Sequence, residues 1–228
     1  MSKVKESKAL EAYYSDKYKY EIGIDEVGRG PMLGRVYSAA VILPKDNSFN
    51  HALMKDSKRF TSKKKINEAA DYIKENALIY SVVYETEEMI DKINIRQATL
   101  KAMHSAINNC LTQLKSKDVV LLVDGNDFKP YMLLDIENEE YNEIPNICIK
   151  GGDNKYAAIA AASILAKVER DAYIEELCKE YPYLDEKYDI LKNKGYGTKN
   201  HMVGIKKYGI TAFHRRSYGI CKDYQVNL

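Results

Sequence analysis

The sequence predicts an α/β protein, in which a mixed β-sheet is flanked by helices and followed by a helical C-terminal part. Three observations lead to this class. Strand-like segments come first, strand and helix patterns then alternate, and the chain from about Tyr181 consists of short helical pieces broken by Pro and Gly. The 228 residues, 45% of them apolar, are enough for one sizeable core.

Short apolar segments bounded by turn residues define the predicted strands. Tyr20–Val27 and Tyr37–Leu43 are separated by a short gap, which predicts an antiparallel pair. Asp118–Asp124 is an almost continuous apolar run, typical of a central strand that is buried on both faces. Further strands are expected at Leu78–Tyr84 and Ile144–Ile149.

Helical spacing of apolar residues occurs in three places. The expected helices run from the Thr61-Ser62 cap to about Asn76, from Thr86 to about Leu114, and onward from Gly151–Asn154. The last one has an alanine-rich face that would pack closely on a sheet. Residues 1–19 are expected to be a separate N-terminal segment, a surface helix. Residues 20–228 then form one domain, of which about 181–228 is the helical C-terminal part.

Charge is distributed unevenly along a chain whose net charge is only +2. Between Lys55 and Lys65 there are six basic residues and one acid, and between Ile190 and Lys222 eight basic residues and no acid. Such patches attract polyanions, but charge runs are also common on ordinary solvated surfaces.

Targeting and cysteine patterns indicate the compartment. No signal-peptide pattern and no run of about 18 apolar residues occurs, so we expect a soluble, cytoplasmic protein without membrane contact. The four cysteines are far apart and form no CxxC pair, which predicts free thiols rather than a disulfide framework or a zinc site.

Acidic residues stand at the ends of predicted strands. Asp25 and Glu26 end the first strand, Asp124 ends the buried one, and Asp153 opens the long helix. Any one of them could simply cap a turn or face water. If the first strand lies beside the buried one, however, the acids converge at the carboxyl edge of the sheet, where ligands of α/β proteins bind.

Such a cluster needs a counter-charge. Two unit charges about 4 Å apart repel by roughly 4 kcal/mol at an effective dielectric constant of 20, so the carboxylates would take up protons or bind a cation. Oxygen ligands without His or Cys favour Mg²⁺ or Mn²⁺ over Zn²⁺. Two such ions, about 3.5–4 Å apart, are typical of phosphodiester hydrolysis. The residues alone therefore predict a metal-dependent nuclease or another phosphoryl-transfer enzyme.

The glycine-rich segment after these acids, GRGPMLG, is not a dinucleotide-binding loop. Its spacing is GxGxxxG, a strand pattern follows where a helix is required, and two acids precede it. A bare backbone would instead let a nucleic-acid strand approach, with backbone groups binding a ribose 2′-hydroxyl and Arg29 binding the adjoining phosphate. A tight turn with glycines at positive φ is compatible with this interpretation.

Six ordered motifs between Gly23 and Tyr218 resemble bacterial ribonuclease HII, the type 2 ribonuclease H: GIDEVGRGPMLGRV, DSKRFTSKKK, LLVDGN, KGGDNKYAAIAAASILAKVERD, KGYGTKNH and HRRSY. The resemblance implies a ribonuclease H-like fold with a five-stranded mixed sheet. It implies an endonuclease, expected to be a monomer, that cuts the RNA of RNA–DNA hybrids. The same enzyme would nick 5′ to ribonucleotides embedded in duplex DNA, leaving 3′-hydroxyl and 5′-phosphate ends, with two Mg²⁺ or Mn²⁺ ions.

The resemblance also assigns roles to individual residues. The acids of the active site would be Asp25, Glu26, Asp124 and Asp153, the first three as metal ligands. Gly28, Arg29 and Gly30 would read the 2′-hydroxyl and the junction phosphate, and Tyr196 would pack on the ribonucleotide and the next deoxyribose. Ser57 and Lys58 would contact the DNA backbone, which positions a duplex without reading its sequence.

Departures from the family pattern and two alternatives accompany the resemblance; one departure is that members often have a Ser-Pro pair near Tyr156-Ala157. Arg35 stands where the family usually has Pro, and KGGD carries one more glycine than the common KGD. Ribonuclease HIII is the nearest alternative, but its loop usually reads GTG and its members carry a sizeable N-terminal domain, whereas only 24 residues precede Asp25. A non-catalytic protein that binds RNA–DNA hybrids is a further alternative, and the intact acids argue against it.

Overall fold

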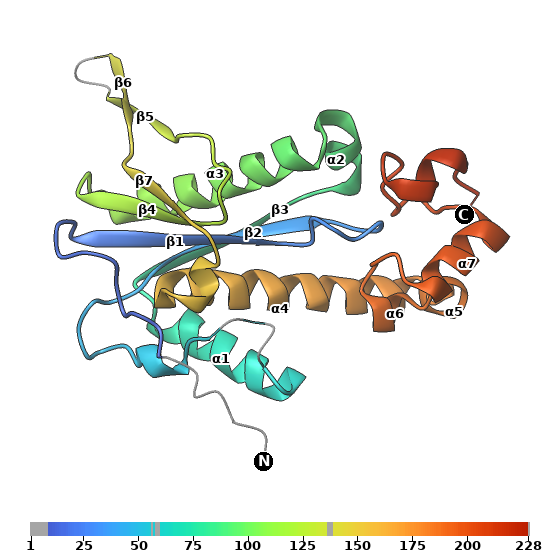
Figure 1. The fold of residues 1–228 in the computed structure, drawn as a ribbon, viewed down its shortest axis with the longest axis horizontal. Coiled ribbons are helices and arrows are strands. Elements are labelled where there is room, and N and C mark those ends of the chain that lie inside the picture. Colours follow the sequence, from blue (N-terminus) through green and yellow to red (C-terminus); the bar gives the residue numbers. More distant parts are fainter. Residues whose placement is uncertain (1–8, 56, 58–59, 136–138, 228) are drawn as a thin grey trace.

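A five-stranded mixed sheet lies at the centre of the molecule, with the strand order β3-β2-β1-β4-β7 (Figure 1). The computed structural model describes residues 9–55, 57, 60–135 and 139–227. The strands of the sheet are β1 (Tyr20–Val27), β2 (Val36–Ile42), β3 (Ile79–Glu85), β4 (Val119–Asp124) and β7 (Asn146–Ile149). β5 (Met132–Asp135) and β6 (Glu140–Glu143) pair with each other as a separate hairpin.

Helices cover both faces of the sheet (Figure 1). The helices are α1 (Lys63–Asn76), α2 (Glu87–Ile93), α3 (Ile95–Leu114), α4 (Ala157–Glu180), α5 (Tyr183–Tyr188), α6 (Ile190–Asn193) and α7 (Lys199–Tyr208). Short 3₁₀ turns are η1 (His51–Leu53), η3 (Gly152–Asn154) and η4 (Gly219–Asp223). α1 and α4 lie on one face, and α2 and α3 on the other. The predicted α/β class and the five-stranded mixed sheet are confirmed.

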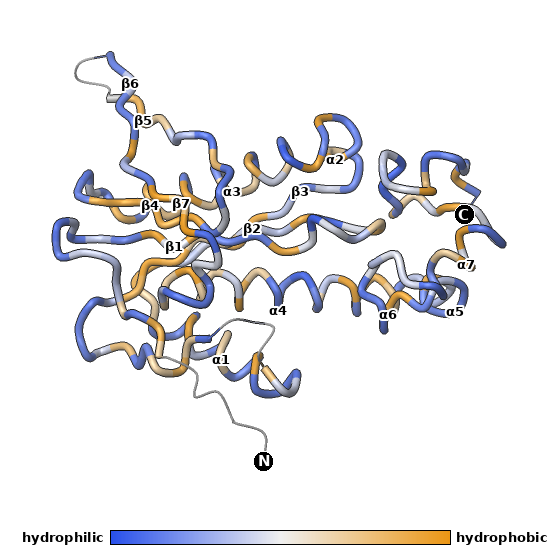
Figure 2. Tube along the Cα trace, in the orientation of Figure 1, coloured by the Kyte–Doolittle hydropathy of each residue, from blue (hydrophilic) through white to orange (hydrophobic). Residues whose placement is uncertain are grey.

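The pairing of the strands confirms two expectations from the sequence. β1 pairs with β2 antiparallel, as expected, and with β4 parallel. β4 also pairs parallel with β7, and its first five residues are buried, which confirms the central position that its apolar run indicates. In Figure 2 the segment around β4 is mostly apolar, whereas the loops at the rim are mostly hydrophilic.

Small residues bring α4 directly onto the sheet. A Cβ added to Gly23 in β1 would lie 2.2 Å from the carbonyl carbon of Ala158 in α4. The buried alanines of α4 pack with residues of β2 and α1 into one core, and the face covered by α3 forms a second. A third core, in the C-terminal part, joins α5, α6 and α7 to the end of α4.

Two sequence expectations need correction, and one element was missed. The helix expected from Thr86 to Leu114 is two helices, because Asn94 has a φ of 66° and its side chain caps α3 by accepting the Gln97 N–H. The exposed hairpin β5–β6 was not predicted. The surface helix expected for residues 1–19 is absent from the described part, residues 9–19. There Glu11 instead forms backbone hydrogen bonds with Lys155, before α4, and with Ala157, the first residue of α4.

Two absences expected from the sequence can be compared with the structure. All four cysteines are free thiols. Within the ranges given above, no helix combines the length and the apolar character that a membrane crossing needs.

Candidate active site

Three acidic side chains meet where two central strands end. β1 and β4 run parallel, with Ile24 paired to Val123. Asp25 and Glu26, near the end of β1, therefore lie beside Asp124, the last residue of β4. The structure therefore brings together the first three acids that the sequence singles out. The parallel pairing produces this convergence, since it places the carboxyl ends of both strands at one edge.

Asp25 is the most deeply buried of the three, with 5% of its surface exposed. Burial raises the pKa of Asp25 well above its usual range, and the charges of Glu26 and Asp124 raise it further. Hydrogen bonds from Ser163 and from the Glu26 N–H act in the opposite direction; the Glu26 N–H donates to Oδ1 of Asp25 over 2.7 Å. A cation at this position would relieve both the desolvation of the charge and the mutual repulsion.

Glu26 faces Arg29 across a hollow in the surface. Nη1 of Arg29 lies 3.5 Å from Oε1 of Glu26. Burial raises the pKa of Glu26, the guanidinium of Arg29 lowers it and the charge of Asp124 raises it. Asp124 lines the same hollow, together with Arg96 and Asp127. Three carboxylates and two guanidinium groups, which are suited to a phosphate, thus share one cavity.

The turn after β7 supplies a backbone donor to Asp124. The Gly152 N–H donates to Oδ1 of Asp124 over 2.6 Å. Gly151 precedes it in the left-handed region, with a φ of 64°, so the additional glycine of KGGD lies in the turn that brings this donor to Asp124. Asp153 follows directly, is buried, and accepts a 3.1 Å hydrogen bond from the side chain of Asn154. Its backbone is therefore next to the Asp124 turn, and its role as the fourth acid stays a prediction.

The carboxylates do not form a preformed cage. Within the described part of the chain, no three His, Cys, Asp or Glu side chains are grouped so that they could hold a metal ion as they stand. Asp25 and Asp124 each accept a hydrogen bond from a backbone N–H, and Glu26 faces Arg29. The donor set nevertheless fits a hard divalent cation, because it consists of carboxylate oxygens, and burial together with the charge of Asp124 raises the pKa of both Asp25 and Glu26.

Two buried arginines, Arg170 and Arg215, hold the glycine loop from behind. Gly28 has a φ of 98°, and a Cβ at this position would lie 2.4 Å from Nε of Arg170, so only glycine fits. Arg170 also donates to the carbonyl oxygens of Leu33 and Lys194, over 3.4 and 2.9 Å. The loop is thus tied to both α4 and the C-terminal part.

Tyr196 lies against the same loop. Its side chain belongs to the GYGT segment, and 49% of the residue is exposed. A Cβ on Gly30 would lie 3.2 Å from Cε1 of the Tyr196 ring. Two segments to which the resemblance assigns substrate contacts are therefore adjacent in space.

Of the two residues expected to contact the DNA backbone, the structure describes only Ser57. Lys58 lies outside the described residues. Ser57 is buried, and its hydroxyl is 3.1 Å from Oγ of Ser163, the residue that hydrogen-bonds Asp25. The Ser57 side chain thus points into the protein and supports Asp25, while its contact with DNA stays a prediction. Arg35, left open by the sequence, packs its guanidinium over two tyrosine rings, with centroid distances of 4.1 and 4.3 Å.

Several residues around the site were missed by sequence reasoning. They are the side chains and the backbone amide that hold the predicted residues in place: Gly152, Ser163, Arg170, His201, His214 and Arg215. The motif HRRSY contains two of them and was noticed only as part of the resemblance. Their partners are distant in sequence, so no periodic pattern reveals them.

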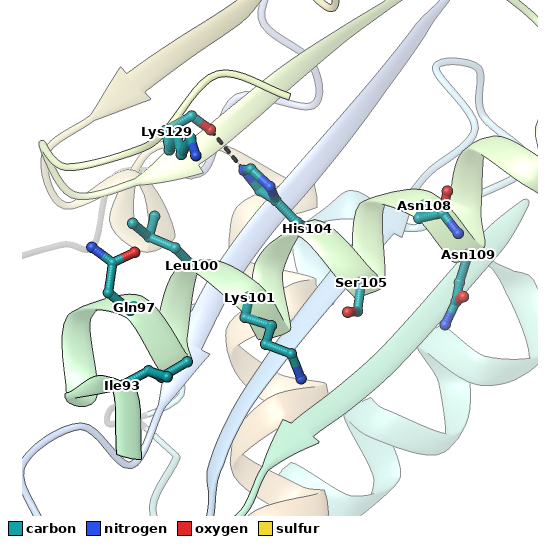
Figure 3. A pocket seen from close by; sticks show the side chains of 9 residues that line it. All are labelled: Ile93, Gln97, Leu100, Lys101, His104, Ser105, Asn108, Asn109 and Lys129. Carbon is teal, nitrogen blue, oxygen red and sulfur yellow. Dashed lines mark hydrogen bonds between the residues drawn. The ribbon is translucent and has the colours of Figure 1, made fainter. Parts of the chain in front are cut away.

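A larger polar groove adjoins the site along α3 (Figure 3). Its lining consists of Ile93, Gln97, Leu100, Lys101, His104, Ser105, Asn108, Asn109 and Lys129. Leu100 lines both this groove and the carboxylate hollow. Nε2 of His104 contacts the carbonyl oxygen of Lys129 over 2.7 Å. The groove contains none of the residues that the sequence singled out.

The sheet order, the helical layers and the acids at adjacent strand ends define a protein of the ribonuclease H-like class. Comparison with known proteins narrows this class. The family model of ribonuclease HII matches residues 22–221. Ribonuclease HII of Bacteroides thetaiotaomicron is 43% identical over 94% of this chain and 97% of its own length. That of Christiangramia forsetii is 43% identical over 88% and 91%. The chain belongs to the ribonuclease HII family and is a ribonuclease H endonuclease.

Solved structures agree on the fold. The ribonuclease H2 of Pyrococcus horikoshii has a TM-score of 0.64 at 24% identity, covering 90% of this chain and 96% of its own. An Archaeoglobus fulgidus RNase HII, solved in complex with PCNA, has a TM-score of 0.64 at 22% identity and covers 88% and 95%. A ribonuclease HIII solved with Mn²⁺ has a TM-score of 0.60 at 18% identity and covers 82% and 70%.

Proposed function

We propose that this endonuclease cuts the RNA strand of RNA–DNA hybrids and nicks duplex DNA 5′ to embedded ribonucleotides, leaving 3′-hydroxyl and 5′-phosphate ends. The observation that carries the proposal is the shared hollow, which Glu26, Asp124 and Arg29 line beside the buried Asp25. Burial and the charge of Asp124 raise the pKa of both Asp25 and Glu26, and buried carboxylates of this kind beside a guanidinium suit chemistry on a phosphodiester.

The metal ligands would be Asp25, Glu26 and Asp124, with Asp153 as the fourth acid. When bound, two divalent ions, Mg²⁺ or Mn²⁺, would supply an activated water and stabilise the leaving oxygen. The protein itself would contribute the orientation of the carboxylates. Ser163 and the Gly152 N–H orient Asp25 and Asp124, respectively, so that these carboxylates are held at the strand ends.

The substrate side of the site would be formed by the glycine loop, Tyr196 and the lysine-rich surfaces. Arg29, exposed over the hollow, would hold the junction phosphate, while the backbone of Gly28–Gly30 would meet the 2′-hydroxyl. The ring of Tyr196, adjacent to Gly30, would pack on the sugar that follows. Ser57 and Lys58 would support contacts with the DNA backbone. We also propose that the enzyme acts as a monomer in the cytoplasm.

A duplex that contains one ribonucleotide tests the proposal. With Mg²⁺ or Mn²⁺ the strand should be nicked on the 5′ side of the ribonucleotide, and a chelator should abolish the reaction. End-labelling of the products should show 3′-hydroxyl and 5′-phosphate groups. If the strand stays intact at micromolar enzyme while a hybrid is still bound, the protein is a non-catalytic binder. Cutting of long hybrids alone would favour the ribonuclease HIII-like alternative.

A further inference from the structure

Arg215 is fully buried and binds the glycine loop with every nitrogen of its guanidinium. Its Nε and two Nη atoms donate to five carbonyl oxygens at distances of 2.6–3.1 Å: those of Gly28, Arg29, Pro31, Gly34 and Arg35. A guanidinium has five N–H donors in a fixed planar arrangement. One side chain, 181 residues away from Gly34 in sequence, thus fixes most peptide planes of this loop.

The direction of these hydrogen bonds determines what the loop presents to a substrate. In a trans peptide the N–H points opposite to the C=O. Since the carbonyl groups of Gly28 and Arg29 point inward to Arg215, the N–H groups of Arg29 and Gly30 are directed away from it. These two N–H groups are therefore available as donors to a ribose hydroxyl or a phosphate oxygen.

His214, the residue before Arg215, is connected to Tyr196 by a chain of buried hydrogen bonds. The Thr211 N–H donates to Nδ1 of His214 over 3.0 Å. Nε2 of His214 is 3.0 Å from Nε2 of His201, and Nδ1 of His201 is 3.0 Å from the carbonyl oxygen of Tyr196. His201 and His214 are both buried.

The groups at the two ends of this chain determine which ring nitrogen of each histidine carries the proton, and the two assignments are compatible. A backbone N–H can only donate, so Nδ1 of His214 accepts and the ring proton is on Nε2. A carbonyl oxygen can only accept, so Nδ1 of His201 carries the proton and its Nε2 accepts from His214. Burial lowers the pKa of both rings, that of His214 to about 3, which keeps both neutral. The chain is thus complete and runs in one direction, from Thr211 to Tyr196.

The glycine loop held by Arg215 and the Tyr196 segment held by the histidine chain contact each other on the substrate side of the site. The Met32 N–H donates to the carbonyl oxygen of Gly195 over 2.8 Å, and the Arg215 N–H donates to that of Met32 over 2.8 Å. The Tyr196 ring lies against Gly30. Neighbouring residues of one buried segment therefore hold both the glycine loop and the peptide that carries Tyr196.

We propose that His214 and Arg215, together with His201, are positioning residues for ribonucleotide recognition. Arg215 sets the outward N–H groups of the glycine loop, and the His214–His201 chain sets the backbone of Tyr196 against that loop. This proposal rests on the proposed function, because it explains how a ribose would be read. It predicts that the three side chains control discrimination between substrates rather than the chemical step.

The first test compares substrate preference in a double-mutant cycle. Tyr196→Ala should lower nicking at a single ribonucleotide, relative to cutting of a long hybrid, on the order of tenfold, as the loss of one stacking contact does. His214→Ala should lower the same ratio similarly, and the double variant should lose little more. Independent, additive losses would show that His214 does not act through Tyr196.

A matched control separates positioning from general damage to the C-terminal part. The Tyr188 ring packs on the rings of both histidines, and its hydroxyl donates to the carbonyl oxygen of Gly209 over 3.1 Å. Tyr188→Phe removes this buried hydrogen bond without touching the chain to Tyr196. Its preference ratio should equal that of the wild type. An equal drop in this variant would mean that any loosening of the C-terminal part suffices, which overturns the proposal.

Arg215 is tested by binding. Lysine keeps the charge but offers one ammonium group, which cannot reach five carbonyl oxygens. With a chelator present, the wild type should bind a duplex with one ribonucleotide more tightly than the all-DNA duplex. Arg215→Lys should lose this preference while binding all-DNA as before. An unchanged preference contradicts the role of Arg215. A wild type that neither prefers nor cuts ribonucleotides would instead refute the proposed function.

The proton positions can be measured on the intact protein, whatever happens to the variants. Nitrogen-15 NMR of the histidine rings distinguishes the two neutral tautomers. We expect His214 to carry its proton on Nε2 and His201 on Nδ1. If either ring carried its proton on the other nitrogen, the hydrogen-bond chain to Tyr196 would be broken, which would contradict the positioning role of His214 and His201.

Discussion

Asp124 accepts the Gly152 N–H with one oxygen and still lies close enough to Asp25 and Glu26 to raise the pKa of both. The three carboxylates thus oppose one another in the metal-free protein. Two of them are also penalised by burial. A charged cluster of this kind lowers the stability of the protein unless a cation is bound. Such a loss of stability is common at functional sites.

Asp124→Asn separates the functional role of this residue from a structural one. Asparagine keeps an oxygen that can accept the Gly152 N–H, so the fold should persist. Cleavage should fall more than about a hundredfold, since even partners behind a metal ligand cost 10–100-fold. Metal-free stability should rise on the order of 1 kcal/mol, because repulsion of Asp25 and Glu26 is relieved. Activity assays and thermal unfolding in chelator measure both effects.

Asp127→Asn is the matched control, because Asp127 lines the same hollow but is bound by Arg96 over 2.6 and 2.7 Å. It should retain cleavage. Loss of folding in Asp124→Asn, or equal loss of cleavage in both variants, would make Asp124 a structural acid.

Single residues of the site were predictable to different degrees. Asp25, Glu26 and Asp124 were found because each ends an apolar strand pattern, and strand ends are visible in sequence. Ser163 was not found, because it lies in an alanine-rich helix and its partners are in other segments. Hydrogen bonds between distant segments leave no periodic signal in the sequence.

At the scale of elements, boundaries marked by local chemistry were predictable. β1 has the expected bounds, and α1 begins after the expected cap Ser62. The break at Asn94 was missed because apolar spacing continues across it, although Asn is a frequent cap. β6 was missed because an exposed, polar strand has no apolar alternation to recognise, and β5, although mostly apolar, is only four residues long.

The contact between β1 and α4 makes Gly23 a sensitive position. Gly23→Ala would place a Cβ 2.2 Å from the carbonyl carbon and 2.4 Å from the oxygen of Ala158, which are backbone atoms. Because neither element can move without disturbing the core, the free energy of unfolding should fall by about 1–3 kcal/mol or more. Denaturant unfolding measures it.

Gly151→Asn is a suitable control for that experiment. No atom lies within 4 Å of a Cβ at this position, and Asn tolerates the left-handed region. Its stability should change by less than about 1 kcal/mol. A Gly23→Ala protein as stable as this control would show that α4 does not pack as closely on β1 as described.

The C-terminal part should be the acid-sensitive element. His201 and His214 have lowered pKa values when folded, so the unfolded chain binds more protons below about pH 6.5. Stability is therefore complete above that pH and declines as the pH falls toward the folded value, about 3 for His214. Between pH 6.5 and 5 the loss from His214 should be on the order of 2 kcal/mol.

Denaturant unfolding between pH 5 and 7 measures this decline, because most carboxyl groups remain ionised in that range. The Tyr188 ring, which packs on both histidines, stays neutral there, and the neighbouring Arg215 stays charged. His214→Gln should show a shallower dependence than the wild type. A stability that is constant over this range would mean that the histidines are exposed or protonated in the folded protein.

At the scale of the whole molecule, the basic patches divide into structural and exposed residues. Of the eight basic residues between Ile190 and Lys222, Arg215 is buried and Lys194 pairs with Glu175 over 3.3 Å. The others are exposed: Lys192, Lys199, Lys206, Lys207, Arg216 and Lys222. Counting charges in the sequence located this surface but overestimated it, since burial is decided by tertiary contacts.

Exposed lysines beside the Tyr196 segment should determine how salt affects substrate binding. Lys192 and Lys199 flank this segment on α6 and α7. If both contact phosphates, Lys192→Gln/Lys199→Gln should reduce the slope of log affinity against log salt by about 1.4–1.8, since each contact contributes roughly 0.7–0.9. Lys17→Gln/Lys19→Gln, exposed before β1 and so at the opposite end of this strand from Asp25, should leave the slope unchanged. Equal slopes for all three proteins would place the nucleic acid on a different surface.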